Sequence, residues 1–264
     1  MLQSMSDWLH GLPLAWMAAV VFGVTYLVAA VIYGAVRIFA TGERARSFKA
    51  VSPGLLSPLG VLLGLFVAFT AVQVWGDNER AENAVIREAS ALRAVTILAA
   101  SFPGAPEARL RALVRGHIQD VVAQEWPMME KGIATLVVTP HPLAEALQTI
   151  IALTPTNPGQ QTAQTQIATQ LEAALEARRQ RILTSHSQVS PLKWLCVFVQ
   201  AVCALFTIAV VHSDDRLAAA ITMGVFATGV AASVLLIAAY DRPFIGELAV
   251  GPQQLLQVMP APID

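Results

Sequence analysis

The sequence predicts an all-α membrane protein with four transmembrane helices and a helical extramembrane domain inserted between the second and third of them. Of its 264 residues, 55% are hydrophobic and only 13% are charged, whereas a soluble domain usually carries about 25% charged residues. Four apolar stretches approach or exceed the roughly 20 residues that cross the hydrocarbon core of a bilayer as a helix. The formal net charge of −1 argues against nucleic acid as a partner, because nucleic-acid binding normally demands a basic face.

The first apolar stretch, residues 12–36, contains no Asp, Glu, Lys or Arg. A cleaved signal peptide is the alternative interpretation. The preceding residues carry Asp7 but no Lys or Arg, and the apolar part is longer than that of a signal peptide. We therefore expect this stretch to remain as a membrane span.

The second apolar stretch, residues 55–76, ends with Trp75, a residue type that is enriched where a span meets the membrane surface. Its Gly60 and Gly64 form a GxxxG pair, which allows another helix to approach closely.

The last two apolar stretches, residues 194–211 and 217–240, are separated by the short polar segment HSDDR. The fourth stretch carries a small residue at every fourth position, and such a row favours helix packing. Its members are Ala220, Gly224, Thr228 and Ala232. The residues predicted to pack helices together are therefore Gly60, Gly64, Gly224 and Thr228.

Residues 77–190 form the only long polar part of the chain. From Asp77 to Ser101 no Gly or Pro interrupts the sequence, and apolar residues recur there at helical spacing. Alternation typical of strands is rare, so we expect a helical bundle. The expected organisation is an N-terminal segment (1–11), span 1 (12–36), a short basic loop (37–54), span 2 (55–76), the helical domain (77–190), span 3 (194–211), span 4 (217–240) and a C-terminal tail (241–264).

The side of the membrane that carries the helical domain is read from the basic residues of the short loops. Arg37, Arg44, Arg46 and Lys49 oppose only Glu43 in the first loop, and positive short loops tend to stay in the cytoplasm. With four spans, the helical domain would then be periplasmic in a bacterial inner membrane. Basic residues of the long helical domain argue for the opposite orientation, but long loops count little.

A set of charged residues follows the second span and precedes the third. One interpretation is a charged vestibule that selects or gates ions, because charge at a pore mouth sets the local potential. The other is structural: Glu88 pairs with Arg178 or Arg181 between packed helices. The set consists of Asp77, Arg80, Arg87, Glu88, Arg178, Arg181 and His186.

No pattern in the sequence predicts catalysis, a metal site or a cofactor. The five histidines are scattered without metal-ligand spacing, and GxSxG, P-loop and dinucleotide-binding patterns are absent. Glu125, next to Trp126 and Pro127, is either a carboxylate whose pKa is raised by its surroundings or the end of a helix. The spans contain no Asp, Glu, Lys or Arg. This argues against an ion-coupled transporter, which usually needs a charged residue in the membrane.

The chain resembles the bacterial bestrophin-like membrane proteins. The resembling segments are LGLFVAFTAVQVWGDNERAENAVIREASALRA (63–94), EWPMMEKG (125–132), RRQRI (178–182) and AYDRPFIGEL (239–248). The bestrophins proper are pentameric anion channels whose second spans line the pore with bulky apolar residues. The resemblance implies a constriction formed here by Leu62, Phe66, Phe69 and Thr70. The bestrophins use four-residue steps, and Leu62 and Phe66 keep this step while Phe69 departs from it. They also hold the inserted domain in the cytosol.

Two functions are therefore expected from the sequence. The first is an oligomeric, passive anion channel, a pentamer if it follows the bestrophins, with a pore lined by the second spans. The second is a non-conducting scaffold or sensor whose helical domain binds a partner or ligand. A symmetric ring with an axial hole favours the channel, and a monomer or closed dimer favours the scaffold; no enzyme is expected.

Overall fold

The structure is a computed structural model that describes residues 11–39, 53–137 and 139–261, and the described residues are mainly helical. Four of the helices are long and apolar enough to cross a membrane: α2 (Leu14–Phe39), α4 (Leu56–Ala99), α9 (Pro191–Val211) and α10 (Arg216–Tyr240). Further helices lie between the second and third of these. The predicted fold class, all-α with four spans and a helical insert, is thereby confirmed.

The chain divides into two compact units. Unit 1 comprises Met1–Gly76 and Gln188–Arg242, and unit 2 comprises Asp77–Ser187 and Pro243–Asp264. The border lies inside the continuous helix α4, at the position where the sequence leads us to expect the second span to end. The apolar first part of α4 thus belongs to unit 1 and its polar second part to unit 2.

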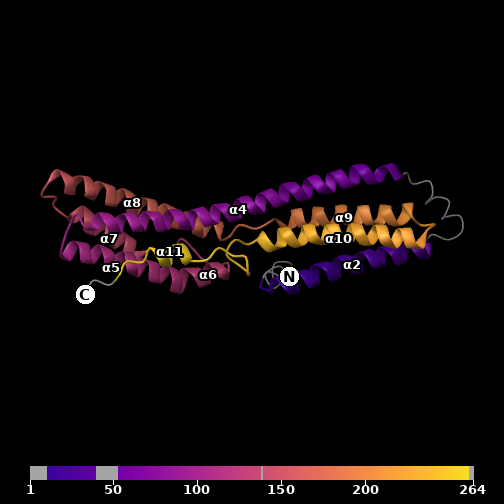
Figure 1. The fold of residues 1–264 in the computed structure, drawn as a ribbon, viewed down its shortest axis with the longest axis horizontal. Coiled ribbons are helices and arrows are strands. Elements are labelled where there is room, and N and C mark those ends of the chain that lie inside the picture. Colours follow the sequence, from indigo (N-terminus) through magenta and orange to yellow (C-terminus); the bar gives the residue numbers. More distant parts are fainter. Residues whose placement is uncertain (1–10, 40–52, 138, 262–264) are drawn as a thin grey trace. The chain divides into compact units, whose positions relative to one another are not determined.

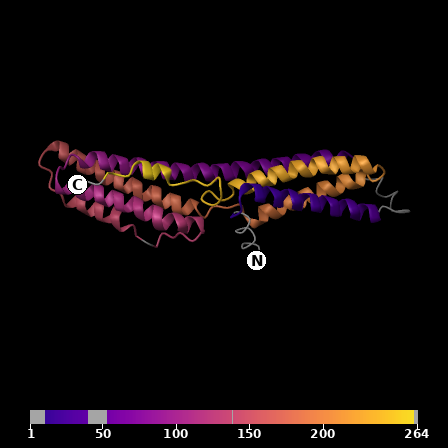
Figure 2. The same ribbon diagram turned by 60° about the horizontal axis from the view of Figure 1, so that its bottom comes forward.

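Unit 1 contains the candidate spans. Helices α2, α9 and α10 lie side by side in both views (Figures 1 and 2). The short 3₁₀ helix η1 (Pro53–Leu55) precedes α4. Asp215 caps α10 by accepting hydrogen bonds from the N–H groups of Leu217 and Ala218 at 2.9 and 3.0 Å. One apolar core joins the three helices through Ala29, Val36, Leu205, Ile208, Ala209, Val210, Met223 and Ala227.

The first part of α4 packs on unit 1 through one side. Ala71 and Val74 share a buried cluster with Val189 and Ile237. The segment before α9 is held by Asp241, whose carboxylate accepts a hydrogen bond from the Val189 N–H at 2.5 Å. The remaining side of this part of α4 therefore has few contacts with the described part of unit 1.

Unit 2 is a helical bundle with its own core. After the second part of α4 come α5 (Ala105–Asp120), the π-helical turn η2 (Val121–Glu125), α6 (Trp126–Glu130), α7 (His141–Ala152) and α8 (Pro158–Thr184). Asn157 caps α8 by accepting from the Gln160 N–H at 2.9 Å, the usual role of an Asn at a helix start. Residues buried in this core include Val85, Leu92, Leu110, Ile118, Leu143, Ile150, Ile167 and Leu171.

The C-terminal tail is folded from Pro243 onward. It belongs to unit 2, where it forms the short helix α11 (Gln253–Gln257). The side chains of Phe244 and Leu255 are 1% and 0% exposed and join the core of unit 2. The Arg115 guanidinium also donates to the carbonyl oxygen of Pro260.

Some expected features fall on residues that the structure does not describe. Residues 1–10 of the N-terminal segment and 40–52 of the basic loop lie outside the described residues. Arg44, Arg46 and Lys49 are among them.

Candidate functional site

The residues predicted to form a pore constriction lie on the first part of α4 and differ in their exposure. Leu62 is 58% exposed and Phe69 is 72% exposed. Phe66 is half-buried. Thr70 is buried, and its hydroxyl donates to the carbonyl oxygen of Phe66 at 2.8 Å. Two of the four residues therefore point away from the rest of the described chain, while Thr70 points toward it.

Leu62 and Phe69 are part of a larger apolar face. Val61, Leu65 and Val72 are also more than half exposed, and their spacing puts them on the same side of the helix. An apolar surface of this kind within a span faces lipid or another copy of the chain.

The glycines of the GxxxG pair are open in the single chain. A Cβ atom added at Gly60 or Gly64 would meet no atom of the described residues within 4 Å. The same holds for Gly224 on α10. Thr228 does contact α2, because its hydroxyl lies 2.8 Å from that of Tyr26.

The row on α10 that is buried within the chain is not the row predicted from small residues. It lies one position earlier and consists of Ala219, Met223, Ala227 and Ala231. The predicted row is only partly covered, because Thr228 and Ala232 are exposed and Gly224 is half-buried.

The residues proposed for a charged vestibule form separate contacts in unit 2. Asp77 pairs with Arg80. Arg87 donates to the side chain of Gln180. His186 lies 2.7 Å from the carbonyl oxygen of Ala134. The remaining three, Glu88, Arg178 and Arg181, meet in one buried cluster.

The centre of this cluster is the ion pair between Glu88 on α4 and Arg181 on α8. Both side chains are 0% exposed, and Nε of Arg181 lies 2.8 Å from Oε2 of Glu88. Nη2 of Arg181 donates to Oε1 of Glu88 at 3.3 Å and to Oε2 of Glu125 at 2.8 Å. The interhelical pairing that the sequence offers as the structural alternative is therefore present.

Three further side chains complete the cluster. His117 on α5, 1% exposed, places Nε2 at 2.9 Å from Oε1 of Glu88. Nε of Arg178 donates to Oε1 of Glu125 at 2.7 Å. The guanidinium of Arg181 also lies over the Trp126 ring, 5.4 Å from its centroid, in a cation–π contact. We call Glu88, His117, Glu125, Arg178 and Arg181 the ion-pair cluster.

The electrostatics of the ion-pair cluster keep its central pair charged. Burial by itself would raise the pKa of Glu88, but the nearby Arg181 and the hydrogen bond from His117 lower it from 4.5 to about 2. Burial would likewise lower the pKa of Arg181, yet the carboxylates of Glu88 and Glu125 raise it above its usual value. Partners at short distance thus outweigh desolvation for both groups.

The sequence places these groups by ordinary helical periodicity. Glu88 follows Val85 and precedes Leu92 on the buried side of α4. His117 occupies the same kind of position on α5, between Val114 and Val121. A polar residue on an otherwise apolar helix face must find a partner once it is buried. This signal points to His117, which sequence analysis did not single out.

Glu125 is positioned by the unusual turn η2. It is the last residue of that turn, and Trp126, the first residue of α6, packs edge-on against Phe244 at a centroid distance of 5.7 Å. Sequence analysis considered Glu125 as a site residue or a helix end, but it did not identify its two arginine partners. Within residues 11–39, 53–137 and 139–261, no three His, Cys, Asp or Glu side chains lie close enough to hold a metal ion.

Comparison with known proteins places these features in context. A family model described as the bestrophin-like domain matches residues 23–255. A comparison with curated protein sequences finds no match.

Among solved structures, the fold is similar to two variants of a bacterial bestrophin homolog from Klebsiella pneumoniae. The TM-scores are 0.68 and 0.69 at 11% sequence identity. The alignments cover 92% of this chain in both cases, and 96% and 97% of the respective homolog chains. A third structure, described only as a membrane protein, has a TM-score of 0.68 at 11% identity and covers 91% of this chain and 95% of its own.

Proposed function

The chain belongs to the bestrophin-like family, and on that premise we propose that it assembles as a homo-oligomer and conducts small anions passively. The pore is lined by the first part of α4 from each copy. The observation that carries this proposal is the exposed apolar face of α4, which includes Leu62 and Phe69.

Three residues of this helix form the proposed constriction. Leu62, Phe66 and Phe69 lie on neighbouring turns, and a ring of such side chains can gate ion flow by excluding water. Thr70 is left out, because its side chain is buried and its hydroxyl bonds within the helix. The bestrophins proper, in which second-span helices carry bulky apolar residues into the pore, supply the precedent.

Contact between copies is proposed to involve the two glycines of α4. Gly60 and Gly64 leave space beside the helix backbone that no described residue fills. Without side chains at these positions, two helices can approach closely and gain van der Waals contact. A pentamer follows if the assembly resembles that of the bestrophins proper.

The charged residues near Asp77 are proposed to contribute to the pore mouth only where they are exposed. The side chain of Arg80 is 67% exposed, and Arg87 is exposed. Glu88 and Arg181 are fully buried, so solvent ions do not reach them. In this proposal Arg80 attracts anions, and Arg80→Glu lowers selectivity for anions over cations; unchanged selectivity in planar bilayers contradicts this role.

The test of channel activity is anion flux into liposomes that contain the purified protein. We expect Phe66→Ala combined with Phe69→Ala to raise the flux, because the smaller side chains let water wet the constriction. The matched control replaces Leu195 and Phe206, 55% and 49% exposed on α9, with Ala and leaves the flux unchanged. No flux from either protein, with the oligomer intact, refutes the channel and favours a scaffold or sensor whose helical unit binds a partner.

A further inference from the structure

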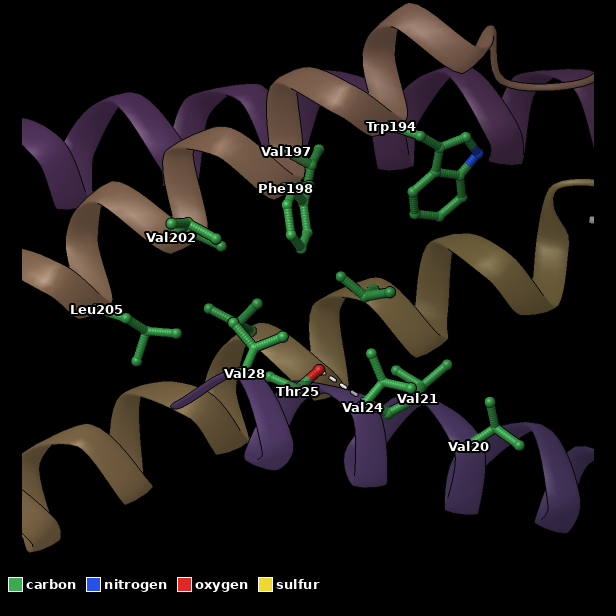
Figure 3. A pocket seen from close by; sticks show the side chains of 13 residues that line it. Val20, Val21, Val24, Thr25, Val28, Trp194, Val197, Phe198, Val202 and Leu205 are labelled. Carbon is green, nitrogen blue, oxygen red and sulfur yellow. Dashed lines mark hydrogen bonds between the residues drawn. The ribbon is translucent and has the colours of Figure 1, made fainter. Parts of the chain in front are cut away.

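An apolar groove runs between α2, α9 and α10 in unit 1. Its volume is about 320 Å³. Phe198 and Val202 point into it from α9, and Val20, Val24 and Val28 reach toward it from α2 (Figure 3). All three helices are candidate membrane spans, so the groove lies within the hydrophobic part of unit 1.

The lining has almost no capacity for polar contacts. Apart from the Trp194 indole, its one polar side chain is Thr25, whose hydroxyl donates to the carbonyl oxygen of Val21 at 2.7 Å. Figure 3 shows this bond running along α2 rather than into the groove. Because an apolar cavity does not hold water stably, the groove suits an apolar occupant.

The size and length of the groove agree with one acyl chain. An apolar protein cavity of about 150 Å³ takes up a benzene molecule, so a cavity about twice as large has room for roughly a dozen carbon atoms. Along α9 the lining extends from Trp194 to Leu205, which at about 1.5 Å per residue is roughly 16 Å. One leaflet of a hydrocarbon core about 30 Å thick is about 15 Å deep.

The charge at one end of the groove fits a phosphate headgroup. Trp194 marks this end, and Lys193 precedes it in α9. The Lys193 ammonium donates to Gln73 and has two further N–H donors. Lys193 thus supplies a cation at the level where Trp and Lys commonly meet the membrane surface, which favours an anionic headgroup.

We propose that this groove is a binding site for a membrane phospholipid, which inserts one acyl chain between α2, α9 and α10 with its phosphate near Lys193. The site does not depend on the channel proposal, because it uses a different surface of unit 1 from the α4 face.

Native mass spectrometry of the full-length protein, purified in mild detergent from membranes that contain phosphatidylglycerol, tests the site. We expect wild type to retain about one phospholipid per chain. Val24→Trp, which fills the groove from a position that is 53% exposed, is expected to lower retention of the phospholipid about fivefold. Leu27→Trp is the matched control, because Leu27 is 64% exposed on the same helix and does not line the groove.

Several results would overturn the proposal. Wild type without bound phospholipid, or with detergent as its only adduct, excludes a lipid site. Equal retention by the Val24→Trp and Leu27→Trp variants places the lipid elsewhere. A change in subunit number caused by Val24→Trp, without loss of lipid, assigns the groove to a second copy of the chain. This experiment does not measure anion flux, so the result for lipid binding is independent of whether the protein is a channel.

Discussion

Arg181 illustrates how a single buried charge can organise a helical bundle. Its guanidinium is fully buried and contacts two carboxylates and an indole ring that come from α4, η2 and α6. Removing one partner from such a group leaves a buried charge without a counter-charge. The resulting loss of folding free energy is larger than the net free energy that the intact pair contributes. The ion-pair cluster therefore joins α4, α5, η2 and α8 within unit 2.

Glu88→Gln should destabilise unit 2 by about 3 kcal/mol, the lower end of the range for breaking a buried ion pair. The lower end applies because Arg181 still pairs with Glu125 in this variant. The measurement is hydrogen exchange by mass spectrometry on α5 and α8 peptides of the full-length protein in detergent. Glu82→Gln is the control, since Glu82 is exposed on the same helix. Equal protection in the two variants would show that the pair contributes nothing.

Acid should weaken unit 2 over a defined pH range. The folded pKa of Glu88 is about 2, below its ordinary value of 4.5, so its contribution is fully present above pH 4.5 and is lost as the pH falls toward 2. The loss is on the order of 3 kcal/mol. The protection factors of the α8 amides, which are exchange rates corrected for the intrinsic effect of pH, should fall over this range in wild type but less in Glu88→Gln. The same pH dependence in both proteins would assign acid sensitivity to other groups.

The Glu88–Arg181 pair could be anticipated from the sequence because both residues occupy buried positions of otherwise apolar helical faces. Which residues pair with which could not be anticipated, because helical periodicity predicts the buried face of each helix but not which helices pack together. His117 and Glu125 join the cluster only through the packing of α5 and η2 against α4 and α8.

Among the helices, the four spans were the most predictable elements. Their apolar length is a strong signal, and span 1, expected at residues 12–36, is observed as α2 from Leu14 to Phe39. The tail gave no comparable signal. Its buried residues Phe244 and Leu255 do not form a periodic apolar pattern. They are buried only because they pack against the core of unit 2.

Phe244→Ala should destabilise unit 2 by about 3 to 5 kcal/mol, the usual cost of truncating a buried Phe. Exchange of the amides near Trp126, which contacts the Phe244 ring, should rise most. Leu256→Ala is the matched control because Leu256 is 45% exposed, and its effect should stay within about 0.5 kcal/mol. If both variants behave alike, the tail does not stabilise unit 2.

For the whole molecule, the sequence predicted the division into spans and a helical insert because hydropathy changes sharply near Asp77. It could not predict whether α4 of one copy meets α4 of another. A face that packs on another copy and a face that contacts lipid are equally apolar, so hydropathy alone does not distinguish them.

The proposed orientation places unit 2 in the periplasm. A membrane-impermeant maleimide should then label Gln161→Cys, an exposed position of α8, in intact spheroplasts. Both native cysteines, Cys196 and Cys203, are replaced by Ser to remove background labelling. Labelling only after the membrane is broken would place unit 2 in the cytosol, as in the bestrophins proper.

The π-helical turn η2 has a consequence for how the ion-pair cluster is aligned. His117 and Glu125 are eight residues apart, which in an uninterrupted α-helix would turn their side chains about 80° away from each other. A π turn takes up one extra residue, so the pair behaves as if it were seven apart and differs in angle by only about 20°. The one added residue thus brings the side chains of His117 and Glu125 to the same side of the helix. Deleting Ala123, one residue of this turn, would leave the two side chains seven residues apart in a uniform α-helix, again about 20° out of phase, so Glu125 should keep its direction toward the arginines.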